Sequence, residues 1–123
     1  MANKLVVISG CSRGLGRALA LEFSYRGWKV AGGARDSKAL DNLKGNFNGE
    51  CLLHPFDVTN HEEVDSFAKL VREKIGIPDL LVNNAGLINK NARLTDISSK
   101  EFADVLAVNL AGVHNMIRAF VPM

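Results

Sequence analysis

The chain has 123 residues, of which 47% are hydrophobic and 23% charged, and 15 Lys and Arg against 13 Asp and Glu give a formal net charge of +2. This length gives room for one domain, and the composition is that of an ordinary globular protein. The charges are interspersed, without a basic run or interleaved aromatic residues, so we expect no nucleic-acid partner. The apolar runs have the length of strands, so we expect no membrane partner.

The cysteines and histidines show no spacing typical of a metal or redox site. Cys11 and Cys51 lie far apart, and Cys51 and His54 would face opposite sides of a strand. We therefore expect no bound metal. Together with the lack of a signal-peptide pattern, this cysteine usage favours a reducing setting, and we expect a cytoplasmic protein.

Strand and helix patterns alternate along the chain. An unbroken apolar run at residues 5–9 is typical of a strand covered on both faces. Two capping boxes, Thr59 with Glu62 and Ser98 with Glu101, predict the starts of two helices. We expect strands at residues 5–9, 28–33, 51–56 and 79–83, and helices at residues 15–25, 37–44, 60–75 and 98–120.

Four alternations of strand and helix predict an α/β fold, a Rossmann-type doubly wound parallel sheet with right-handed crossovers and helices on both faces. The pattern ends after the fourth strand and the following helix, which would leave the last strand as an uncovered edge. We therefore expect residues 1–123 to be a single, truncated domain.

The stretch SGCSRGLG lies between the first strand and the first helix, and it places Gly10, Gly14 and Gly16 in a G-x-x-x-G-x-G spacing. Gly10 permits a sharp turn, Gly14 lets a pyrophosphate approach the backbone, and Gly16 lets the helix lie close to the sheet. Amides at the helix start then attract phosphate. The alternative is a glycine-rich turn that binds nothing. We expect a dinucleotide-binding turn.

The end of the second strand predicts which dinucleotide is bound. An acid there would hold the ribose hydroxyls of NAD, but the sequence has Ala34 followed by Arg35, and Arg13 lies in the glycine turn. Two guanidinium groups suit a 2′-phosphate, so we expect NADP(H) in preference to NAD(H). Asp36 leaves two alternatives to NADP(H) preference open: its carboxylate would neutralise Arg35, or it would itself bind the ribose hydroxyls. Two unrelated surface arginines are the other alternative.

Asn109 lies on the apolar stripe of the last helix, with Val105, Val113 and Met116 on the same stripe. An unpaired amide there would cost about 1–3 kcal/mol, so something polar must meet it. One alternative is a structural amide bonded to nearby backbone. The other is a functional role.

The ordered motifs resemble those of the short-chain dehydrogenase/reductase family. They are SGCSRGLG, with Ser9 in place of the commoner Thr; Asp57 near the end of the third strand; the Asn-Asn-Ala-Gly sequence at residues 83–86; and Asn109 in the last helix. All four occur in order, so the resemblance covers the whole chain. It implies an NAD(P)-binding Rossmann domain over residues 1–123 whose catalytic C-terminal half is absent.

The resemblance also implies roles for single residues. Asp57 would accept from the adenine amino group, Val58 would line the adenine pocket, and Asn84 with Gly86 would border the ribose. Asn109 would be the one catalytic residue present, because it helps to hold a water on a proton path. The cofactor-binding residues are then expected to be Ser9, Gly10, Ser12, Arg13, Gly14, Leu15, Gly16, Arg35, Asp57, Val58, Asn84, Ala85 and Gly86.

Tyr25 and Lys29 match the Tyr-x-x-x-Lys spacing that is the acid–base signature of the family. The signature requires both residues on one helical turn, whereas Gly27 and Trp28 mark the end of a helix and the start of a strand. We expect Tyr25 to pack at the helix end and Lys29 to be solvated. Since Tyr25 is the only tyrosine, the catalytic Ser, Tyr and Lys are expected after residue 123.

We therefore expect part of an NADP(H)-dependent carbonyl or aldehyde reductase that acts on a small carbonyl or alcohol and is a homo-oligomer when complete. The stretches NNAGLINKNA and SRGLGRALALEF resemble plant-type NADPH-dependent pterin aldehyde reductases, which implies a pterin aldehyde as substrate. The alternatives are a non-catalytic NADP(H)-binding module and a truncated form that docks on a partner.

Overall fold

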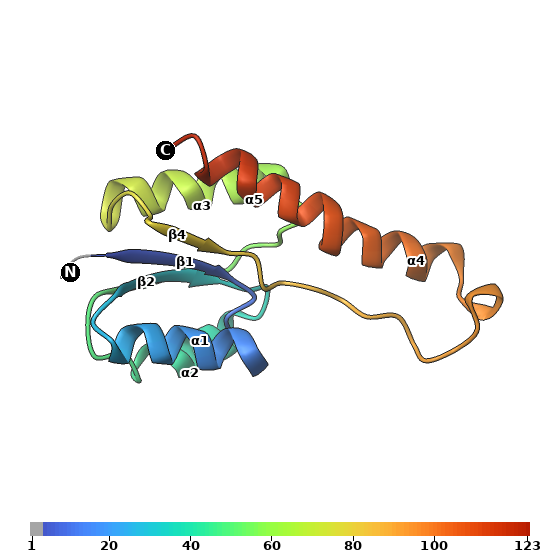
Figure 1. The fold of residues 1–123 in the computed structure, drawn as a ribbon, viewed down its shortest axis with the longest axis horizontal. Helices are drawn as coiled ribbons and strands as arrows, with labels where there is room; N and C mark the ends of the chain where they lie inside the picture. The colour runs from blue at the N-terminus through green and yellow to red at the C-terminus, as the bar shows by residue number, and fades with distance from the viewer. Residues whose placement is uncertain (1–3) are drawn as a thin grey trace.

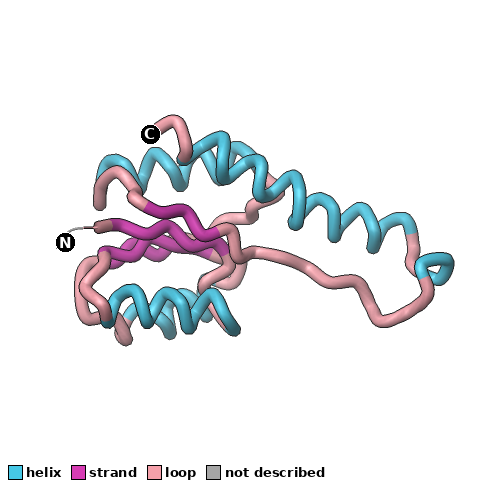
Figure 2. The backbone as a smooth tube through the Cα atoms, viewed as in Figure 1, coloured by secondary structure: helices cyan, strands magenta, loops and turns pink. Residues whose placement is uncertain are grey.

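The computed structural model describes residues 4–123, and it has a four-stranded parallel sheet between two layers of helices (Figures 1 and 2). The strands are β1 (Leu5–Ser9), β2 (Lys29–Gly33), β3 (Cys51–Leu53) and β4 (Leu80–Val82). The helical segments are α1 (Gly14–Tyr25), α2 (Ser37–Lys44), α3 (His61–Lys74), the 3₁₀ turn η1 (Leu94–Asp96), α4 (Ser99–Leu106), the π-helical η2 (Ala107–Gly112) and α5 (Val113–Phe120). The predicted α/β fold is confirmed.

The strand order β3-β2-β1-β4 makes the sheet doubly wound. The chain runs from β1 outward to β3 and then returns to place β4 on the other side of β1. The order therefore reverses between β1 and β4, and in open α/β sheets ligands bind beyond the carboxyl ends of the strands at such a point. The strand order therefore predicts a ligand site at the loops that follow β1 and β4.

Strand β1 is apolar along its whole length because both of its faces are buried. Leu5 and Val7 pack into the cluster beneath α3 and α5, whereas Val6 and Ile8 pack into the cluster beneath α1 and α2. None of the four is more than 1% exposed. Figure 1 shows the same arrangement, with α1 and α2 on one face of the sheet and α3 and α5 on the other.

The third strand is shorter than predicted, because it ends at Leu53 instead of continuing to Phe56. Pro55 has no N–H to donate to a ladder. The amides on either side of it still donate to the neighbouring strand, from His54 to Gly32 at 3.1 Å and from Phe56 to Ala34 at 3.1 Å. The chain therefore stays beside β2 after the regular strand has ended.

The capping box predicted for Thr59 and Glu62 is wrong by one position. The N-cap of α3 is Asn60, whose Oδ1 accepts from the amides of Glu62 and Glu63, each at 3.1 Å. Glu63 reaches back to the Asn60 side chain, with an Nδ2–Oε2 distance of 3.1 Å. The Thr59 hydroxyl instead donates to Asp57. Asn caps a helix as well as Thr does, so the residue type alone did not decide the start.

The second predicted box is confirmed for its N-cap only. Ser98 Oγ accepts from the amide of Glu101 at 3.1 Å, and α4 begins at the next residue. The Glu101 carboxylate does not complete the box, because its Oε2 accepts from the amide of Lys90 at 2.6 Å. Glu101 therefore ties the long loop before α4 to the helix.

The sequence predicted one continuous helix over residues 98–120. In the structure, a π-helical segment, Ala107–Gly112, separates α4 from α5. Met116 and Phe120 of α5 are buried, whereas α4 has no buried residue. In Figure 1, α4 extends past the end of the sheet. Only the second half of this long helix contributes to the core.

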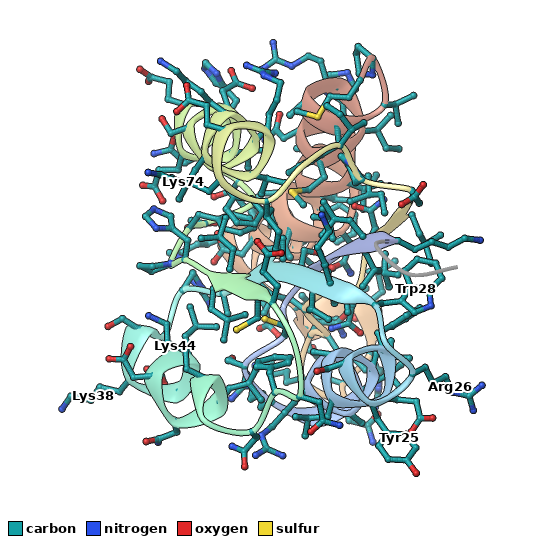
Figure 3. All side chains as sticks on the ribbon, turned by 90° about the vertical axis from the view of Figure 1, so that its left-hand side faces the viewer. Tyr25, Arg26, Trp28, Lys38, Lys44 and Lys74 are labelled. Atoms are coloured by element: carbon teal, nitrogen blue, oxygen red, sulfur yellow. The ribbon has the colours of Figure 1, made fainter. Side chains whose placement is uncertain are left out.

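Tyr25 and Lys29 do not form a pair. The Tyr25 side chain is at the last turn of α1, is 76% exposed and projects outward in Figure 3. Lys29 Nζ donates to the carbonyl of Ile75 at 2.7 Å, at the C-terminal end of α3 on the other face of the sheet. The two side chains therefore lie apart, as expected. The expectation that Tyr25 packs at the end of α1 is wrong, and Lys29 is bonded to a helix end instead of being only solvated. Carbonyls at a helix C-terminus attract a cation.

Candidate cofactor-binding site

A cleft of about 450 Å³ lies at the carboxyl ends of β1, β2 and β4. It is formed by the glycine turn after β1, the loop after β2, the segment after β3 and the loop after β4. Ten of the residues predicted to bind the cofactor line it: Gly10, Ser12, Arg13, Gly14, Arg35, Asp57, Val58, Asn84, Ala85 and Gly86. Residues that are far apart in the sequence thus meet at one place.

The three glycines of the turn have different structural roles. Gly10 and Gly14 have φ angles of 67° and 58°, in the region that favours glycine. A Cβ on Gly14 would meet nothing within 4 Å, which leaves that side of the turn open to the cleft. A Cβ on Gly16 would overlap the carbonyl of Gly10 and the side chain of Asn84. Gly16 therefore lets α1 lie against the strand ends, as predicted.

The N-terminus of α1 has no side-chain cap. Its N-cap is Arg13, which makes no capping hydrogen bond, and the first turn has no acidic residue. Helices α2, α3 and α4 are capped by the side chains of Asp36, Asn60 and Ser98, whereas α5 continues directly from the π-helical segment. Free amides and the helix dipole at such an end favour an anion. This end borders the cleft.

Ser9, Leu15 and Gly16 do not line the cleft. Ser9 is buried, and its Oγ accepts from the amides of Asn84 at 3.1 Å and Ala85 at 3.0 Å. The Asn84 side chain donates to the carbonyl of Gly10 at 2.9 Å. Through these hydrogen bonds, Ser9 at the end of β1 fixes the loop after β4 beside the glycine turn. The Leu15 side chain is exposed and is not part of the cleft lining.

Both predicted arginines, Arg13 and Arg35, line the cleft and are exposed. Asp36 also lines it, but its Oδ1 accepts from the amides of Lys38 at 3.0 Å and Ala39 at 3.2 Å and so caps α2. Among residues 4–123, no ion pair involves Arg35. Asp36 therefore does not neutralise Arg35 here, and its carboxylate has a structural role.

Asp57 presents one free carboxylate oxygen. Its Oδ1 accepts from the amide of Thr59 at 2.9 Å and from the Thr59 hydroxyl at 2.8 Å. Over the described residues, Oδ2 has no hydrogen-bond partner, and neither does the amide of Val58. One acceptor and one donor therefore lie at this end of the cleft without a protein partner.

Asn109 does not line the cleft, although it supports the cleft wall. Its Oδ1 accepts from the amide of Leu87 and its Nδ2 donates to the carbonyl of Leu87, each at 2.8 Å. This is the backbone-bonded alternative that the sequence left open. Leu87 lines the cleft, so Asn109 acts on the site through Leu87.

Sequence reasoning missed several residues that line the cleft, namely Gly33, Ala39, Phe56, Leu87 and Val108. Only Gly33 carried a signal, because two successive glycines in a strand indicate a close approach. A Cβ at Gly33 would overlap the Phe56 ring and the carbonyl of His54. Apolar lining residues look like ordinary core residues in a sequence, so nothing marked the others.

Cys11 belongs to the glycine turn but is buried, and burial raises the pKa of its thiol to about 11. A Cβ on Gly32 would lie 2.8 Å from Cys11 Sγ, so the thiol fills the space beside that glycine. Burial also raises the pKa of Cys51. Both cysteines are free.

Across residues 4–123, no three His, Cys, Asp or Glu side chains are grouped to hold a metal ion. Over the same residues, no helix has the length and apolar character to span a bilayer.

The parallel sheet, the glycine turn after β1 and the cleft at the strand ends define a Rossmann-type fold. The family profile described as short chain dehydrogenase matches residues 4–123, and the chain belongs to this family of oxidoreductases. An NADPH-dependent pterin aldehyde reductase from Arabidopsis thaliana is 42% identical over 125 aligned residues, which cover all of this chain and 52% of that protein.

Solved structures give the same result. An alcohol dehydrogenase from Thermococcus sibiricus complexed with 5-hydroxy-NADP has a TM-score of 0.88 and 37% identity over 98% of this chain and 52% of that one. A 3-ketoacyl-(acyl-carrier-protein) reductase from Brucella melitensis complexed with NADH has a TM-score of 0.93 and 30% identity over 97% of this chain and 49% of that one. The chain therefore spans about half the length of these relatives.

Proposed function

We propose that the cleft binds NADP(H) and that the chain is the cofactor-binding part of an oxidoreductase, which transfers hydride between the nicotinamide and a small carbonyl or alcohol. The observation that carries this proposal is the open, uncapped N-terminus of α1 at the switch point of the sheet. Its free amides and the exposed side of Gly14 suit a pyrophosphate.

The preference for NADP(H) rests on Arg13 and Arg35. Both line the cleft: Arg35 follows the end of β2, where an acid would bind the ribose of NAD, and Arg13 belongs to the glycine turn after β1. Asp36 is occupied as the cap of α2, which leaves Arg35 free to bind a 2′-phosphate. The Arabidopsis relative is named as NADPH-dependent, and the Thermococcus structure contains an NADP derivative. The Brucella structure, with NADH, shows that the fold accommodates either dinucleotide.

The remaining lining residues suit the other parts of the cofactor. The free Oδ2 of Asp57 and the free amide of Val58 match the amino group and a ring nitrogen of adenine. Asn84, Ala85 and Gly86, in the loop after β4, also line the cleft, and we place the ribose there. Asn109 would support the reaction indirectly, because it holds Leu87 at the cleft wall.

The substrate we propose is a pterin aldehyde or a carbonyl compound of similar size. Support comes from the 42% identity to the plant pterin aldehyde reductase, whose other half has no counterpart in these 123 residues. The reaction we propose is hydride transfer between NADP(H) and the carbonyl carbon of such a compound.

We also propose that the protein forms homo-oligomers in a reducing, cytoplasmic setting. The exposed face of the long helix carries Phe102, Leu110 and Ile117, which are 49%, 65% and 42% exposed. Apolar side chains grouped on one helix face favour contact with a partner. Both thiols are free, which fits a reducing compartment. Light scattering that gave only the monomer mass over the micromolar range would contradict the oligomer.

Calorimetric titration with NADPH and NADH at one fixed ionic strength tests the central proposal. We expect both to bind, with a lower Kd for NADPH. Binding of neither dinucleotide would refute the proposed function.

A further inference from the structure

Two asparagines of the long C-terminal helix contact loops that line the cleft, and only Asn109 was singled out by its motif. The other is Asn115 in α5, whose Nδ2 donates to the carbonyl of Val58 at 2.8 Å. Asn109 bonds the loop after β4, whereas Asn115 bonds the segment after β3. One helix therefore holds two walls of the cleft.

A glycine brings this helix close to Val58. Gly112 is buried at the end of the π-helical segment, and a Cβ there would lie 2.7 Å from Val58 Cγ2 and 3.0 Å from Val58 Cβ. Both distances are shorter than ordinary carbon–carbon contacts. Gly112 thus packs against the side chain of Val58 while Asn115 bonds its carbonyl.

Val58 belongs to a tight turn, and both Val58 and the neighbouring Asp57 line the cleft. The amide of Asn60 donates to the carbonyl of Asp57 at 3.0 Å, which closes the turn around Val58. Val58 is 8% exposed, so most of its side chain is fixed by packing. Holding Val58 therefore also fixes its own free amide and the neighbouring Asp57 carboxylate.

We infer that Asn115, together with Gly112, is a positioning residue for the adenine end of the cleft. It holds the turn at Val58 so that the free Asp57 Oδ2 and the Val58 amide stand as an acceptor–donor pair that selects adenine. This inference rests on the proposed function, because it requires that a dinucleotide occupies the cleft. It adds that base selectivity is set from α5, outside the cleft lining.

The test compares NADPH with nicotinamide hypoxanthine dinucleotide phosphate in its reduced form, whose base carries an oxo group where adenine has an amino group. Both ligands are titrated into the protein and into Asn115→Ala, Gly112→Ala and Arg118→Ala. Arg118 lies in the same helix but pairs with Asp65 at the surface, so Arg118→Ala is the matched control. Circular dichroism verifies that each variant is folded.

We expect the protein to prefer NADPH. In Asn115→Ala the affinity for NADPH falls roughly fivefold, the effect of about one hydrogen bond, and the preference over the hypoxanthine ligand shrinks. Gly112→Ala lowers the same preference because its methyl displaces Val58, and Arg118→Ala leaves it unchanged. If Asn115 and Gly112 had only a structural role, the affinities for the two ligands would fall by the same factor.

An unchanged preference in the two variants, or the unfolding of both, would overturn the inference and leave these residues a structural role only. If the unmodified protein binds neither ligand, the proposed function itself fails. These two failures are distinguishable because the first is seen only in the variants.

Discussion

Asn109 and Leu87 form a closed pair, in which both polar atoms of the asparagine side chain bond the backbone of one residue, at 2.8 Å each. Asn109 comes from the π-helical segment and Leu87 from the loop after β4. π-Helical turns are frequent at functional sites. Here the segment carries the side chain that fixes a wall of the cleft.

Replacing Asn109 with Ala would leave the amide and carbonyl of Leu87 without their partner. We expect the free energy of unfolding to fall by about 1–3 kcal/mol, the effect of an unsatisfied polar group. Urea denaturation measures it. Asn89→Ala is the matched control, since the Asn89 side chain bonds only the exposed carbonyl of Lys90, and we expect a change within about 0.5 kcal/mol. Equal losses of unfolding free energy in both variants would show that the bonds between Asn109 and Leu87 stabilise the fold no more than an exposed hydrogen bond does.

Replacing Arg35 with Ala tests the 2′-phosphate site. We expect the affinity for NADPH to fall about tenfold to hundredfold, as for a lost charge-assisted hydrogen bond, with little change for NADH. Calorimetry with both dinucleotides measures this. Arg26→Ala removes the same charge from an exposed pair with Glu22 and should change neither affinity. A similar loss for NADPH and NADH in Arg35→Ala would exclude Arg35 as the discriminating residue.

Gly14 and Gly16 should respond differently to a methyl group. Gly14→Ala has room for its Cβ but keeps a φ near 58°, so we expect a loss of about 1–2 kcal/mol in unfolding free energy. Gly16→Ala would overlap Gly10 and Asn84, so we expect a larger loss, about 3 kcal/mol or more. Thermal and urea unfolding give both values. The reverse order would mean that α1 does not lie against the strand ends as described.

The buried thiol of Cys11 should make stability depend on alkaline pH. Burial raises the pKa of this thiol from 9.0, the value of an unperturbed cysteine, to about 11 in the folded protein. The unfolded chain therefore loses its proton first as pH rises, so the free energy of unfolding should decline between about pH 9 and pH 11. Urea denaturation of the protein and of Cys11→Ala over this range measures the difference. Identical slopes for the two would contradict a buried, neutral Cys11.

Much of the fold followed from local patterns. The apolar run at β1 was long and bounded by a polar start and a glycine, so its ends were found correctly. The bounds of α2 were also found correctly, and Gly45 follows its last residue. These elements were predicted because sequence signals close to their ends agree with the burial that the sheet imposes.

Other features depend on contacts between distant segments and were not predictable. Lys29 bonds Ile75 only because the start of β2 lies beside the C-terminal end of α3 in the folded chain. The π-helical segment, with Asn109 at its centre, has no local sequence mark. Asn109 of this segment bonds Leu87, and Gly112 of the same segment packs against Val58, which belongs to a loop far from Leu87 in the chain.

The candidate site was predictable in its glycine turn and its polar residues, because backbone conformation and phosphate chemistry demand particular residue types there. Asp36 could not be assigned from the sequence, since a carboxylate at that place suits a ribose or a helix cap equally. The structure gives it the cap of α2. Asn115 carried no signal at all, because its partner is a backbone carbonyl.

The most direct test of the account is a titration of ¹⁵N-labelled protein with NADPH and then NADH, followed by amide chemical shifts. We expect shifts at Gly14 and Val58, which line the cleft, and at Gly16 in the first turn of α1, with saturation at a lower concentration of NADPH than of NADH. Shifts confined to the other face, around Asp65 and Arg118, or no saturable shifts with either dinucleotide, would contradict it.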